Sequence, residues 1–102
     1  MPNARELLKP KEIAVRLSKL GGWSLKDKKL HREYRFDDFV HAFAFMSACA
    51  LHAESMKHHP EWFNVWNKVT VDLNTHDAGG ITELDFLLAE KMEITAGKLG
   101  AK

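Results

Sequence analysis

The chain has 102 residues, of which 45% are hydrophobic and 28% are charged. This length and balance fit one compact domain with a modest core, so we expect residues 1–102 to form a single domain. The 15 basic and 14 acidic residues nearly cancel to a formal net charge of +1, and scattered lysines form no basic stripe. A direct nucleic-acid partner is therefore not expected.

The cysteine content and the amino-terminal residues indicate the cellular compartment of the protein. Cys49 is the single cysteine, which excludes an internal disulfide and a thiolate zinc site and suits a reducing compartment. Residues 1–6 lack the apolar segment of a signal peptide, and nowhere do about 18 apolar residues run together. We expect a cytoplasmic protein with no membrane association.

The amino-terminal part predicts a helix and then a hairpin. Pro10 suits the first turn of a helix, and apolar residues follow at helical spacing until Gly21-Gly22 ends it. Residues 23–25 and 30–36 flank a charged turn and alternate as strands do, with Arg32 as the exception.

The longest predicted element is a helix of about 20 residues that follows an aspartate N-cap at Asp37-Asp38. Aromatic and small apolar residues recur along it at helical spacing. Pro60 disfavours the helical conformation at His59, so the helix should end near His58. The side chains of His58 and His59 should therefore point in different directions.

Residues 63–75 alternate as a strand does. They form either one long strand or two strands joined at Asn67-Lys68, because asparagine tolerates the positive φ of a tight turn. Thr82 and Asp85 then resemble a capping box at the start of a last helix. Helix, hairpin, long helix, strands and helix, in this order, predict an α+β fold whose antiparallel sheet is covered on one face by helices.

A group of polar residues around Pro60 is the strongest candidate for a site. Imidazole gives and takes protons near neutral pH, so the neighbouring His58 and His59 indicate proton transfer. Glu54 lies four residues before His58 and would share its helix face, where it would orient that imidazole. His76 follows beyond the strand segment and would complete the site.

Two other interpretations of these residues stay open. Histidine beside proline at a helix end is often a cap or a solvated surface residue. Neutral imidazoles also bind zinc, and Glu54 would add an oxygen ligand, although no recognised ligand spacing is present. Proton transfer and metal binding are therefore separate hypotheses.

The motif Glu54-x-x-x-His58-His59-Pro60-Glu61-Trp62-Phe63-Asn64-Val65, which continues to Val69, resembles the pterin-4a-carbinolamine dehydratase family, also called the dimerisation cofactor of a homeodomain transcription factor. Residues 75–82 extend the resemblance, which reaches nearly the whole chain. It implies the order α-β-β-α-β-β-α with a four-stranded antiparallel sheet, and hence a hairpin at Asn67-Lys68. It also implies a homodimer or homotetramer.

The resemblance implies dehydration of 4a-hydroxytetrahydrobiopterin to quinonoid dihydropterin and water, in tetrahydrobiopterin recycling. No metal or redox cofactor is implied. The implied catalytic residues are His58, His59 and His76, with Glu54 as their carboxylate neighbour. The implied substrate-binding residues are Lys57, His58, His59, Asn74, Thr75, His76 and Asp77. Lys57 stands where family members can carry aspartate, and Asn74 stands where serine can occur.

The family name also implies an alternative function, in which the protein is a coregulator that stabilises the dimer of a transcription factor. This role would add a nuclear location. The long helix would supply the contact surface, through Phe43, Phe45 and Met46.

Overall fold

A computed structural model describes residues 4–102. Its elements are α1 (Pro10–Leu17), β1 (Ser24–Lys26), β2 (Lys29–Arg35), α2 (Phe39–Met56), β3 (Glu61–Val65), β4 (Lys68–Leu73), the 3₁₀ helix η1 (His76–Ala78) and α3 (Glu83–Lys98). The predicted order α-β-β-α-β-β-α is confirmed. The strands form one antiparallel sheet in the order β1-β2-β4-β3, so β1 and β3 are its edges.

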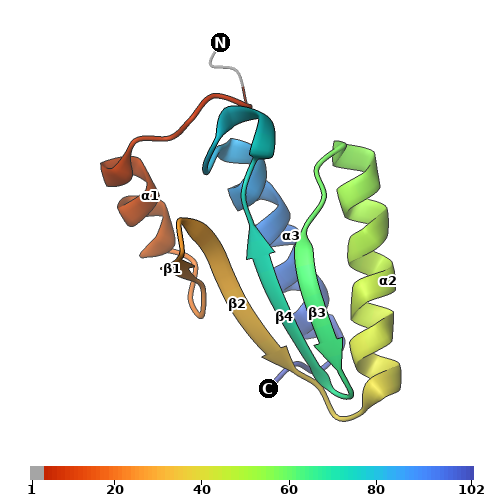
Figure 1. Ribbon diagram of the computed structural model, residues 1–102. Coiled ribbons are helices and arrows are strands. Elements are labelled where there is room, and N and C mark those ends of the chain that lie inside the picture. The colour runs from red at the N-terminus through yellow and green to blue at the C-terminus, as the bar shows by residue number, and fades with distance from the viewer. Residues whose placement is uncertain (1–3) are drawn as a thin grey trace.

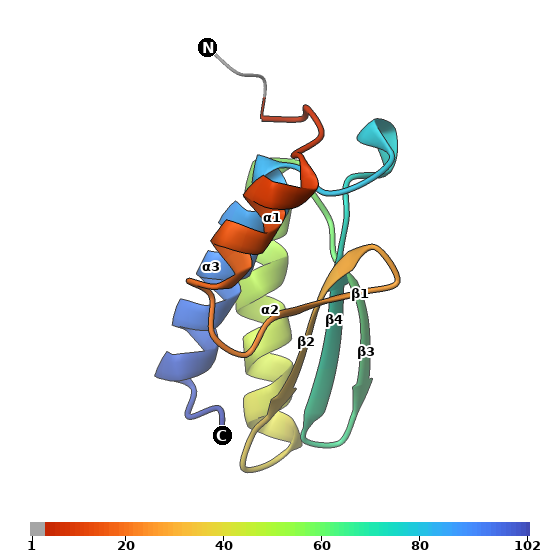
Figure 2. The same ribbon diagram turned by 90° about the vertical axis from the view of Figure 1, so that its left-hand side faces the viewer.

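The elements form two layers. Helices α2 and α3 run along one face of the sheet, and α1 lies beside α3 on the same side (Figures 1 and 2). None of the three α-helices covers the opposite face in the described part of the chain (Figure 2). This arrangement is the α+β fold that the sequence predicts. Within residues 4–102, no helix is long and apolar enough to cross a membrane.

The segment after Pro60 is a hairpin, as the resemblance implies, but its turn differs from the prediction. The loop is Trp66-Asn67, and Trp66 rather than Asn67 has the positive φ, of 51°. Asn67 instead binds the segment before α2. Its side-chain Nδ2 donates to the Phe36 carbonyl, and its own carbonyl accepts from the Phe36 N–H, both at 2.9 Å. This tertiary contact positions the segment that leads into α2. It could not be predicted from the residues around Asn67, because its partner lies 31 positions away.

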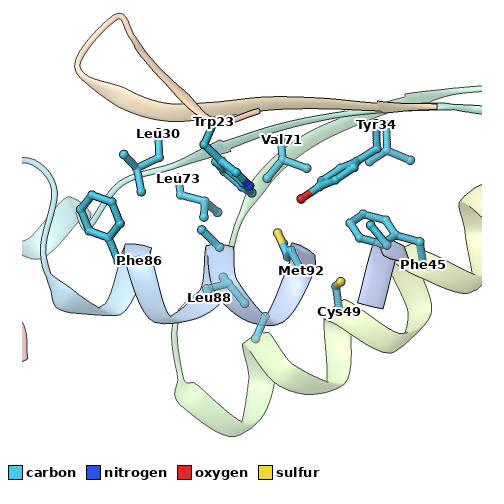
Figure 3. Close-up of a cluster of buried hydrophobic side chains, with 14 of the residues drawn as sticks. Trp23, Leu30, Tyr34, Phe45, Cys49, Val71, Leu73, Phe86, Leu88 and Met92 are labelled. Carbon is cyan, nitrogen blue, oxygen red and sulfur yellow. The ribbon is translucent and has the colours of Figure 1, made fainter. Parts of the chain in front are cut away.

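The core fills the space between the sheet and the two long helices (Figure 3). The inner face of the sheet supplies Tyr34 and Val71, while α2 supplies Phe45, and all three are 0% exposed. The ring centroids of Tyr34 and Phe45 lie 5.0 Å apart. The expectation that Phe45 contacts a partner is therefore wrong, whereas its neighbour Phe43 is 55% exposed.

The structure explains why Arg32 breaks the apolar alternation of its strand. Glu93 of α3 accepts hydrogen bonds from Arg32 Nε at 3.0 Å, from the Tyr34 hydroxyl at 2.6 Å and from Trp23 Nε1 at 2.9 Å. Burial, together with this carboxylate, raises the pKa of Tyr34. Arg32 thus faces inward because it neutralises and helps to satisfy Glu93.

Helix α1 packs more weakly than α2 and α3, since none of its residues is buried. It ends at Leu17, before the Gly21-Gly22 pair that was expected to end it. Arg16 attaches it to α3: its guanidinium binds both carboxylate oxygens of Glu83 and lies 4.6 Å from the Phe86 ring centroid. A paired hydrogen bond of this kind between arginine and a carboxylate is directional as well as ionic.

We expect Glu83→Gln to lower the free energy of unfolding at pH 7 by about 0.5–1 kcal/mol, because the pair is partly exposed. Arg16 holds the pKa of Glu83 below its ordinary value of 4.5. The ion pair therefore stabilises the folded state above that value, and its contribution disappears as the pH falls through the lowered pKa. Urea unfolding of both proteins at pH 7 and pH 3 measures this. An equal difference at the two pH values would contradict it.

Candidate active site

The predicted site residues meet at one end of the sheet, where α2 ends, β3 begins and β4 leads into η1. This end is at the top of Figure 1. A pocket of about 170 Å³ lies there, and two chain segments far apart in sequence line it together with one residue from the amino-terminal segment. The lining residues are Arg5, Lys57, His58, His59, Asn74, Thr75, His76 and Asp77.

The end of α2 determines how the two neighbouring histidines point. The helix ends at Met56, and Lys57 adopts the left-handed conformation, with φ 53° and ψ 42°. The His58 N–H then bonds back to the Ala53 carbonyl at 3.0 Å, which is the usual closure after a left-handed cap. As predicted, the two imidazoles diverge: His58 is buried at 5% exposure, whereas His59 is exposed.

His58 has a different carboxylate partner from the one expected. Its Nε2 lies 2.6 Å from Oδ1 of Asp85, which is 0% exposed. Glu54 instead lies 2.9 Å from Nε2 of His59. The predicted contact between Glu54 and His58 is wrong because the helix ends before position 58, so the four-residue spacing no longer places the two side chains on one face.

Asp85 connects this histidine to the start of α3. Its Oδ2 accepts from the Thr75 hydroxyl and from the Thr82 backbone N–H, each at 2.9 Å, and the two threonine hydroxyls lie 2.7 Å apart. A buried carboxylate is stable only with such partners. The capping box of Thr82 and Asp85 is confirmed, but nothing in the sequence linked Asp85 to His58, 27 positions earlier.

His59 and His76 lie at the open mouth of the pocket. Their side chains are 64% and 75% exposed. His76 Nε2 lies 3.5 Å from Oε2 of Glu61, which is within ion-pair distance but makes no hydrogen bond. One imidazole at the base of the pocket and two at its mouth can exchange protons with a bound molecule.

Two further features of the pocket concern binding. Arg5, which sequence reasoning missed, donates from Nη2 to the Lys57 carbonyl at 3.1 Å. No local pattern marks it, because it lies 52 positions from its partner. Asn74 Oδ1 is buried and has no hydrogen-bond partner within the described chain, so it is available to accept a hydrogen bond from a ligand.

The metal hypothesis predicts a set of ligands close together. Among residues 4–102, no group of three or more histidine, cysteine, aspartate or glutamate side chains is arranged to hold a metal ion. His58, His59 and His76 instead each lie beside one carboxylate.

Comparison with known proteins gives a consistent result. Residues 6–95 match the family model described as pterin 4 alpha carbinolamine dehydratase. A pterin-4-alpha-carbinolamine dehydratase homologue of Solibacter usitatus is 56% identical over 89 residues, which cover 87% of this chain and 94% of that protein. A homologue of Rhizobium johnstonii is 50% identical over 95 residues, covering 91% and 94%.

The fold is also found in a crystal structure from Brucella melitensis, described as a transcriptional coactivator/pterin dehydratase. That chain is 46% identical in sequence and superimposes with a TM-score of 0.86, with 88% of this chain and 98% of that chain covered.

Proposed function

Because the chain belongs to the pterin-4-alpha-carbinolamine dehydratase family, whose members are hydro-lyases, we propose that its pocket dehydrates 4a-hydroxytetrahydrobiopterin in tetrahydrobiopterin recycling. The products are quinonoid dihydropterin and water. The observation that carries the proposal is that His58, His59 and His76 line one pocket, each beside a carboxylate.

The reaction needs two proton transfers. The bond between C4a and its hydroxyl oxygen breaks, and an acid protonates the departing oxygen to give water. A base removes the proton from N5, and the electron pair of that N–H bond forms the double bond between N5 and C4a. Nothing is oxidised or reduced, so two positioned imidazoles, one giving and one taking a proton, can perform both transfers.

His58 and Asn74 would have separate roles in this reaction. When Nε2–H of a neutral His58 donates to Asp85, the unprotonated nitrogen of the ring is Nδ1. Nδ1 can then exchange a proton with the substrate. The unpartnered Asn74 Oδ1 would accept a hydrogen bond from a ring N–H or an amino group of the pterin. Lys57, Thr75 and Asp77 complete the proposed substrate contacts at the pocket.

The test is the loss of carbinolamine absorbance when purified protein is added to freshly generated 4a-hydroxytetrahydropterin. A catalytic acceleration is expected. For replacements of the three pocket histidines, His31→Ala is the matched control and should keep the wild-type rate. His31 is a half-buried histidine of β2 that does not line the pocket.

A second candidate function rests on the outer face of α2. Val40, Phe43 and Leu51 are 72%, 55% and 75% exposed, and with Ser47 they follow one another at helical spacing. We propose that this stripe binds a second copy of the chain in a homodimer or homotetramer. The coactivator description of the Brucella protein supports a further proposal, that the oligomer contacts a transcription factor.

Leu51→Asp is expected to reduce the mass of the oligomer measured by light scattering at micromolar concentration, because a charge on an apolar contact disfavours association. The dehydratase rate per chain should change little if each pocket is complete in one chain. A wild-type protein that is monomeric under these conditions would contradict the oligomer proposal.

A further inference from the structure

Glu61, the first residue of β3, has an unusual environment beside the pocket. Its Oε1 accepts a hydrogen bond from Lys29 Nζ at 2.7 Å. Its Oε2 is buried and has no hydrogen-bond partner within the described chain, although Nε2 of His76 lies only 3.5 Å away. A buried acceptor without a partner is costly, and such exceptions in native proteins often belong to functional groups.

The sheet explains how these three side chains meet. Glu61 lies opposite Asp72 in the pairing of β3 with β4, and Asp72 alternates with the buried Val71 and Leu73, so Glu61 lies on the face that α2 and α3 do not cover. Lys29 comes from β2, on the other side of β4, and reaches across that strand to Glu61. His76 follows β4 and returns over the start of β3. Glu61 is therefore held by the pairing of β3 with β4 and by the hydrogen bond from Lys29 of β2, whereas the side chain of His76 is 75% exposed.

We propose that Glu61 is a positioning residue for His76. When the pocket is occupied, Nε2–H of His76 donates to Oε2 of Glu61, which orients the ring and leaves Nδ1 to face the substrate. This inference rests on the proposed proton-transfer role of His76. It gives each of the three histidines its own carboxylate: Asp85 for His58, Glu54 for His59 and Glu61 for His76.

Lys29 determines which carboxylate oxygen of Glu61 is available to His76. Its hydrogen bond with Glu61 raises the pKa of the Lys29 ammonium, so that group stays charged and keeps Oε1 occupied. Oε2 is then the oxygen available to His76. In Glu61→Gln the single carbonyl oxygen would accept from Lys29, and the amide NH₂ would face Nε2 of His76, donor against donor.

Glu61→Gln is therefore expected to lower kcat by roughly tenfold, part of what a positioned acid or base contributes, with KM within about twofold of wild type. Asp72→Asn is the matched control, because Asp72 lies opposite Glu61 in the sheet but is paired with His31, outside the pocket. It should leave both constants within about twofold.

A double variant separates positioning from a structural role. In a His76→Ala background, Glu61→Gln should have no further effect on kcat, because there is no imidazole left to orient. A full tenfold loss in that background, or an unchanged kcat in the single variant, would overturn the inference.

Nuclear magnetic resonance of the His76 ring tests the inference without measuring the dehydratase rate. In ¹⁵N-labelled protein saturated with 7,8-dihydropterin, the Nε2–H proton of His76 should be protected enough from exchange to be observed, and should vanish in Glu61→Gln. An Nε2 without an observable proton in the wild-type complex would overturn the inference. A wild-type protein that shows this proton but does not dehydrate the carbinolamine would contradict the proposed function instead.

Discussion

Asp85→Asn is expected to lower the free energy of unfolding by about 2–3 kcal/mol, because a buried group would lose a hydrogen-bond partner. The carboxylate accepts from His58, Thr75 and the Thr82 N–H through both of its oxygens. Asparagine offers one acceptor oxygen and places an amide NH₂ where the other oxygen was. If the amide oxygen faces the two threonines, the NH₂ faces Nε2 of His58, which must then give up its proton and become an acceptor. In the opposite orientation the NH₂ faces the Thr82 N–H, donor against donor.

The same substitution is expected to reduce the dehydratase rate by roughly a hundredfold, because a wrongly oriented His58 cannot exchange protons efficiently. Urea unfolding and the absorbance assay measure the two effects. Asp77→Asn is the control for stability: Asp77 is exposed in η1, so its replacement should change the unfolding free energy by less than about 0.5 kcal/mol. An Asp85→Asn protein with wild-type stability and rate would contradict the role given to the buried pair.

Single replacement of His58, His59 and His76 by alanine is expected to produce the largest losses of activity. The residues that serve as acid and base should each lose about 10²- to 10⁴-fold in kcat/KM, the usual contribution of a positioned proton-transfer group. Undiminished rates in all three variants would exclude acid/base catalysis by these histidines.

The three variants should differ in stability. His58→Ala leaves Asp85 buried without its ionisable partner, and breaking a buried pair in this way costs about 3–5 kcal/mol. His59 and His76 have exposed side chains, so their removal should cost less than about 0.5 kcal/mol. Urea unfolding of the three proteins side by side therefore separates loss of the fold from loss of chemistry.

Features encoded by neighbouring residues were predicted well. The capping aspartate Asp38 accepts from the His41 N–H at 2.8 Å, and the charged turn of the first hairpin adopts positive φ at Asp27 and Lys28, as such turns require. The divergence of His58 and His59 was predicted from Pro60, although the helix already ends at Met56, before the left-handed Lys57. In each case the deciding interaction lies within a few residues of the signal.

Features that depend on contacts between distant segments were not predictable. The turn moved to Trp66-Asn67 because the Asn67 amide binds the carbonyl of Phe36, 31 positions away. Asp85 was identified as a cap but not as the partner of His58. One local feature was also missed: the contact expected between Glu54 and His58 is absent because Lys57 adopts the left-handed conformation and the helix ends at Met56.

The burial of side chains on α2 could not be predicted from the sequence either. Phe43 and Phe45 have the same residue type and neighbouring positions, but one is 55% exposed and the other is fully buried. The helix is apolar on most of its surface, so periodicity could not identify the face that meets the sheet. Only the position of Tyr34 and the rest of the inner sheet face decides it.

Whether this chain dehydrates a pterin carbinolamine is decided by stopped-flow absorbance of freshly generated 4a-hydroxytetrahydropterin, with and without purified protein. The geometry of the pocket predicts that substoichiometric protein accelerates the loss of the carbinolamine signal, and that the rate rises in proportion to protein concentration. A decay identical to that in buffer, with correctly folded protein present, would contradict the assignment of this site.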